Sequence, residues 1–109
     1  MTYAQEQLYE AMYCVTSVGP LQSRLASAAH YLIRLTADED FPDHEQGDTW
    51  RRIMHDLTHI QPEADEGSFA ATTKRMDDSE ALRVAREILH LYVSLVRRDA
   101  ERAANRLAA

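Results

Sequence analysis

The stretch DDSEALRVAREILHLYVSLVRRDAERAANRL, residues 77–107, indicates one long amphipathic helix. Asp77 and Glu80 have the spacing of a capping box, and Met76 with Ala81 could form the hydrophobic staple around it. No glycine or proline interrupts the segment, and apolar residues recur at helical spacing through it. At 1.5 Å per residue this helix is about 43 Å long. The residues expected on its inner face are Leu82, Ala85, Leu89, Tyr92, Val93, Val96, Ala100, Ala103 and Leu107.

The rest of the chain also has helical periodicity and lacks the alternating pattern of strands. Helices are expected at about 2–17 with Thr2 as N-cap, at 20–37, and at 49–60 with Asp48 as N-cap. A short helix beginning near Ser68 should precede the long one. We therefore predict an all-α fold, a four-helix bundle with a short additional helix before a long C-terminal helix, in a single domain over residues 1–109.

The composition narrows the class of protein. The apolar fraction is 45% and the charged fraction is 28%, as in ordinary globular chains. No apolar run reaches the roughly 18 residues that a membrane span requires. The first residues lack the features of a secretion signal, and Cys14 is the only cysteine, so no internal disulfide can form. A cytoplasmic protein without membrane contact is expected.

The sequence HDLTH, residues 55–59, is the strongest candidate for chemistry, because histidines four residues apart on a helix can chelate a metal. At about 100° per residue, however, His55 and His59 lie almost opposite the apolar side that Trp50, Ile53 and Leu57 form. A solvated helix face is therefore favoured. A metal-dependent enzyme that uses the two histidines remains a weaker alternative.

Other catalytic patterns are weaker still. The chain has no glycine-rich phosphate loop and no nucleophile elbow, and the acidic segment 38–48 lacks the ligand order of a calcium loop. Cys14 stands among apolar neighbours in a predicted helix, which is typical of a small core residue. We expect no catalytic residue, no resident metal and no cofactor.

The C-terminal turns suggest a partner-binding surface. The last helix should extend beyond the other helices, which are about 20–27 Å long, while its apolar spacing continues. An apolar stripe without a partner in its own domain usually finds one elsewhere. A frayed, alanine-rich tail is the alternative. The predicted partner-binding residues are Val96, Ala100, Ala103 and Leu107, with Arg97, Arg98 and Arg102 at the rim. The leading interpretation is a non-catalytic interaction module, a homodimer or the subunit of another protein.

A second interpretation follows from the distribution of charge. Residues 1–78 carry 6 basic and 14 acidic groups, a net −8, whereas residues 79–109 carry 6 basic and 4 acidic groups, a net +2. Arg83, Arg86 and His90 could then form a face that binds nucleic acid or another anion. The overall charge of −6 and the lack of a helix-turn-helix signature argue against it.

One resemblance concerns most of the chain. It is carried by Arg24-Leu25, Asp40-Phe41-Pro42, Trp50, Ile53, Leu57-Thr58, Glu66-Gly67-Ser68, Thr72 or Thr73, Met76, Ile88 and Leu91-Tyr92. In these residues the segment 20–95 resembles a group of small, uncharacterised bacterial all-helical proteins. The resemblance implies a bacterial or phage setting and an all-helical fold, and it carries over no catalytic residue.

Overall fold

The computed structural model describes residues 1–63 and 65–108, and this part of the chain contains α-helices and no strand. In chain order the helices are α1 (Tyr3–Val15), α2 (Leu21–Leu32), α3 (His44–Thr58), α4 (Ser68–Thr73) and α5 (Asp78–Ala108). The expected all-α fold, with a short helix before a long C-terminal one, is confirmed. Within the described residues, no helix combines the length and apolar character needed to cross a membrane.

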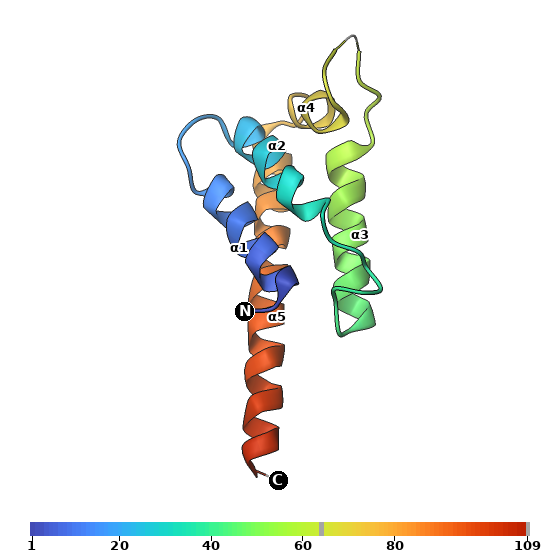
Figure 1. The fold of residues 1–109 in the computed structure, drawn as a ribbon. Coiled ribbons are helices and arrows are strands. Elements are labelled where there is room, and N and C mark those ends of the chain that lie inside the picture. The colour runs from blue at the N-terminus through green and yellow to red at the C-terminus, as the bar shows by residue number, and fades with distance from the viewer. Residues whose placement is uncertain (64, 109) are drawn as a thin grey trace.

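Helix α5 is the axis of the fold (Figure 1). The hairpin of α1 and α2 packs on one side of it, and α3 lies along another side and runs in the opposite direction. Gly19, with φ of 104°, makes the tight connection between α1 and α2 in a conformation that other residues rarely adopt. The short α4 lies near the N-terminal end of α5 and packs against α2 and α3.

The inner face of α5 differs from the predicted one. Ile88 is fully buried, whereas Leu82, Leu89 and Val96 keep 42%, 40% and 42% of their surface exposed. The residues of α5 that are buried are Ala81, Val84, Ala85, Ile88, Leu91 and Leu95. Of the predicted inner residues Ala85 is buried, but most of the others belong to a second apolar stripe, about 120° around the helix from the buried one, that runs farther along the chain. The other helices cover the shorter stripe, which ends at Leu95.

The predicted helix caps agree with the structure at two N-termini, and one predicted C-terminus does not. Thr2 and Gln5 form a reciprocal capping box at the start of α1. The Asp77 carboxylate accepts a hydrogen bond from the Glu80 amide at 2.8 Å, as its spacing predicted. Helix α2 ends at Leu32, earlier than the predicted residue 37.

The start of α3 was predicted wrongly. The helix begins at His44 with Asp43 at its N-cap position, rather than after Asp48. Gly47, which the predicted bounds left outside this helix, lies inside it. The segment before α3 approaches closely there, since a Cβ atom on Gly47 would lie 2.8 Å from the Ala37 carbonyl oxygen. The same segment is held at Trp50, whose indole donates a 2.9 Å hydrogen bond to the Leu32 carbonyl. Phe41 of this segment is buried in the core.

The two stripes of α5 can be separated by neighbouring substitutions. Ile88→Ala should lower the free energy of unfolding by about 2–5 kcal/mol, because it removes fully buried atoms and leaves a cavity. Leu89→Ala should cost about half as much or less, since that side chain is already partly in water. Urea denaturation of both variants measures the difference. Equal losses would contradict the observed orientation of α5.

Gly47 offers a test of the contact that positions the start of α3. In an open helix a glycine-to-alanine change gains about 1 kcal/mol, but here the methyl group meets the Ala37 carbonyl. Gly47→Ala should therefore destabilise the protein by about 1 kcal/mol or more. Gly67→Ala is the matched control, because no atom lies within 4 Å of its Cβ position. A Gly47→Ala protein that melted above wild type would show that this contact is absent.

Candidate partner-binding face and polar cleft

The exposed stripe of α5 has the spacing of a coiled-coil seam. Its positions alternate steps of four and three residues, and all but Arg86 are apolar. We call this set the outer stripe: Leu82, Arg86, Leu89, Val93, Val96, Ala100, Ala103 and Leu107. Val93 is half-buried, and the other members are exposed. The outer stripe contains all four apolar residues that the sequence predicted for partner binding, and it extends farther toward the N-terminus than predicted.

The C-terminal segment of α5, residues 97–108, extends beyond the other helices (Figure 1). Every residue in it is exposed, and Leu107 keeps 89% of its surface in solvent. The segment nevertheless remains helical through Ala108. The expected overhang is therefore present in the fold.

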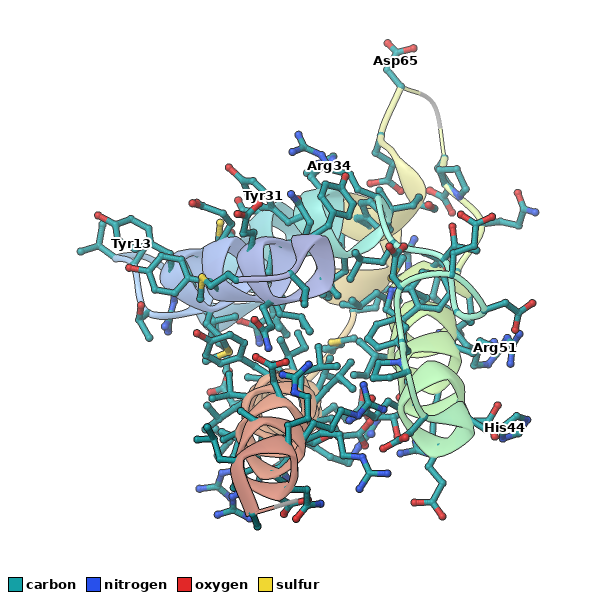
Figure 2. The ribbon with its side chains drawn as sticks, turned by 60° about the horizontal axis from the view of Figure 1, so that its bottom comes forward. Tyr13, Tyr31, Arg34, His44, Arg51 and Asp65 are labelled. Atoms are coloured by element: carbon teal, nitrogen blue, oxygen red, sulfur yellow. The ribbon has the colours of Figure 1, made fainter. Side chains whose placement is uncertain are left out.

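Helix α1 adds aromatic surface beside the outer stripe. Tyr9 and Tyr13 are 49% and 66% exposed, and Tyr13 projects away from the body of the protein (Figure 2). Together with Met12 they line a shallow, mainly apolar groove whose other wall is Leu89 and Tyr92 of α5. These two tyrosines were not predicted to form a surface. Their helical face is shared with Glu6 and Glu10, which was the available signal that it is exposed.

The arginines predicted at the rim have different surroundings. Arg98 and Arg102 approach the Asp43 carboxylate of the same chain, at 3.2 and 3.7 Å. These two side chains thus link α5 to the N-terminus of α3. Among the described residues Arg97 has no ion pair within 4.0 Å, so its charge is the most accessible of the three.

The predicted anion-binding face is weaker than its sequence suggested. Arg83 lies 3.3 Å from an Asp56 oxygen and 2.8 Å from a Glu87 oxygen. Burial lowers the pKa of Arg83, but its hydrogen bonds to the two carboxylates outweigh this effect and raise the pKa overall. Arg86 and His90 are exposed on the same side of α5. Two carboxylates therefore offset the Arg83 charge that an anion would need.

Neither the histidine pair nor the cysteine forms a reactive cluster. His55 and His59 are exposed, with their rings stacked at a centroid distance of 5.5 Å. Within residues 1–63 and 65–108, no three His, Cys, Asp or Glu side chains are grouped to hold a metal ion. Burial, followed by the charge of Glu10, raises the pKa of the Cys14 thiol, which depletes the reactive thiolate.

A polar cleft separates the first turns of α3 from the middle of α5. We call it the α3–α5 cleft; its volume is about 330 Å³. The residues that line it are Asp43, Glu45, Gln46, Thr49, Arg52, Glu87, His90, Leu91 and Ser94. His44 and Arg51 point away from it on the outer side of α3 (Figure 2). Of these residues, only His90 was predicted from the sequence as a binding residue.

Gln46 is the unusual member of the cleft. Its side chain is 7% exposed, and its Nε2 donates a 2.8 Å hydrogen bond to the Ser94 hydroxyl. Its Oε1 has no hydrogen-bond partner within the protein, and neither does Oε2 of Glu87. A buried polar atom left unpaired costs about 1–3 kcal/mol. An apolar residue at position 46 would avoid that cost, so stability alone would not favour glutamine there.

The exposed position of the histidine pair yields a direct prediction. A His55→Ala/His59→Ala protein should unfold within about 0.5 kcal/mol of wild type, because both side chains lie in solvent. Chelation with EDTA should leave the melting temperature of the wild-type protein unchanged. Tight zinc binding that the double substitution abolished would instead establish a metal site.

Comparisons of this chain with protein-family models, curated proteins and solved structures find no match. The outer stripe and the α3–α5 cleft are the features of the fold from which a function can be inferred.

Proposed function

We propose that this protein is a non-catalytic interaction module that forms a homodimer through the outer stripe of α5. The observation that carries the proposal is that this seam continues, in one register, from the body of the protein into a helical segment that no other described part of the chain covers. Solvent-exposed apolar residues at coiled-coil spacing are stabilised when a second helix packs on them.

The size of the surface suits a dimer. Residues 82–107 span about 39 Å of helix. Burial of even 500 Å² of apolar surface would contribute a gross ~12 kcal/mol at about 25 cal/mol per Å². Association entropy and side-chain ordering subtract about 4–15 kcal/mol from such a total. The stripe is therefore near the lower limit for a stable interface, and the tyrosines of α1 would enlarge it.

An antiparallel arrangement fits the composition of the stripe better than a parallel one. A parallel, in-register pair would place Arg86 against Arg86 of the second copy at the centre of the seam. In the antiparallel pair with full overlap, Arg86 faces the small Ala103 of the second copy, and Leu82 faces Leu107. Large side chains then meet small ones along much of the seam, which allows close packing.

Charge complementarity supports the same arrangement. The C-terminal segment carries four arginines and two acids, whereas α1 carries Glu6 and Glu10 and no basic residue. In the antiparallel pair the C-terminal segment of one copy runs along the half of α5 that adjoins α1 of the other. Opposite charges then lie at the edges of the contact, where they contribute orientation more than affinity.

The dimer can be tested with charges placed on and off the stripe. Light scattering of the wild-type protein at micromolar concentration should give twice the chain mass of 12.4 kDa. Ala103→Glu/Leu107→Glu should give a monomer with unchanged helix content, because it buries carboxylates in the seam. The control Asn105→Glu/Ala108→Glu adds the same charge beside the stripe and should remain dimeric. A monomeric wild type would overturn the proposal.

Disulfide trapping tests the orientation in a Cys14→Ser background. Mixed chains carrying Leu82→Cys and Leu107→Cys should crosslink to each other on oxidation, because these positions face in the antiparallel pair. Leu107→Cys alone should not crosslink, since its two copies would lie about 38 Å apart. Efficient crosslinking of Leu107→Cys alone would indicate a parallel dimer.

A further inference from the structure

The packing between α3 and α5 changes from apolar to polar along its length. Toward its C-terminus α3 contributes Ile53 and Leu57, both fully buried in the core. Toward its N-terminus the same side of α3 presents Gln46 and Thr49, which line the α3–α5 cleft. Below the cleft a second hollow of about 470 Å³ shares Asp43, Gln46, His90 and Ser94 with it. The bundle is thus open where its residues are polar.

Two unpaired oxygen atoms define the polarity of the cleft. The Glu87 carboxylate uses Oε1 for Arg83, at 2.8 Å, while its buried Oε2 has no hydrogen bond. The Gln46 amide uses one end for Ser94 and leaves Oε1 unpaired. An ionised carboxylate can only accept hydrogen bonds, so a ligand that completes this pair must donate them.

The charges around the cleft select a cation over an anion. Asp43, Glu45 and Glu87 line it together with the basic residues Arg52 and His90, so an anion would approach three carboxylates. Arg98 and Arg102 approach Asp43, and Arg83 holds the outer oxygen of Glu87. Arg52 lies 3.6 Å from the free Glu87 oxygen, makes no hydrogen bond to it, and leaves 59% of its own side chain exposed. It can therefore move aside for a competing cation.

We propose that the α3–α5 cleft binds a small organic cation that carries an ammonium or guanidinium group. The N–H donors of that group bond to Oε2 of Glu87 and Oε1 of Gln46, and Leu91 packs against its hydrocarbon part. The volume of about 330 Å³ is at the lower end of the range for ligand pockets, which restricts the site to small compounds. Such a site would explain why position 46 is a glutamine, although an apolar residue there could extend the core between α3 and α5.

Calorimetric titration of the full chain with n-butylammonium and butylguanidinium tests the site, with butyrate and n-butanol as anionic and neutral counterparts. At least one cation should bind saturably with a Kd on the order of a millimolar or lower, and the counterparts should not. In ¹⁵N-labelled protein the Gln46 side-chain amide signals should shift along the same titration. The absence of saturable binding by both cations overturns the proposal.

Two single substitutions should change the binding in opposite directions, and a third should leave it unchanged. Glu87→Gln should weaken binding about tenfold or more, because it removes the charged acceptor. Arg52→Gln should strengthen binding, since it removes the competing cation. Asp48→Asn, an exposed acid of α3 outside the cleft, should leave it unchanged. A loss of binding in Asp48→Asn as large as that in Glu87→Gln would show nonspecific charge attraction and overturn the site.

Two further measurements keep the result interpretable. Circular dichroism should show native helix content in each variant. Gln46→Leu should remain folded and bind the cations more weakly, because an apolar side chain tolerates this position but cannot accept a hydrogen bond. The Ala103→Glu/Leu107→Glu protein should bind them as the wild type does, so that failure of the dimer and failure of the cleft are distinguishable.

Discussion

Burial of one face of α5, from Ala81 to Leu95, is the interaction on which the other elements depend. Helices α1, α2 and α3 all pack against α5, and its fully buried Val84 and Ile88 lie in the one core cluster. Because α1, α2 and α3 pack around the buried face of α5, they leave the outer stripe uncovered. The apolar residues of the outer stripe are consequently exposed by the architecture itself. The same packing that stabilises the monomer leaves a second apolar face free.

The sequence was sufficient for the fold class and insufficient for the orientation of α5. Caps at Thr2 and Asp77 and the apolar side of α3 depend on residues three or four apart, and each was predicted correctly. The choice between the two stripes of α5 depends on which helices are near it, which is tertiary information. Leu82 and Leu89 are as apolar as Ile88, so periodicity alone cannot rank them. The start of α3 was predicted wrongly for the same reason, since the position of Gly47 depends on its contact with Ala37, ten residues away.

The two candidate sites also differ in whether local sequence features or tertiary contacts define them. The overhanging part of the outer stripe could be anticipated, because helix length and apolar spacing are local properties of residues 96–107. The α3–α5 cleft could not, since Gln46 and Glu87 are forty-one residues apart and each resembles an ordinary surface residue in its own helix. Only their meeting in the cleft, with one buried oxygen on each that accepts no hydrogen bond within the protein, distinguishes them. Sites of this kind are recognisable from structure and not from spacing.

The C-terminal segment of α5 remains helical although no core packs against it. An isolated helix of about twelve residues is marginal in water, because forming its first turn is unfavourable. Here the first turns are already fixed by burial up to Leu95, so each further residue only extends an existing helix. The 3.7 Å approach of Arg98 to Glu101 and the alanines at 100, 103 and 104 favour this extension. Exposed ion pairs such as those to Asp43 contribute little rigidity. A helix ordered in this way is presented to a second copy already in its binding conformation, so association need not bear the entropy of folding it.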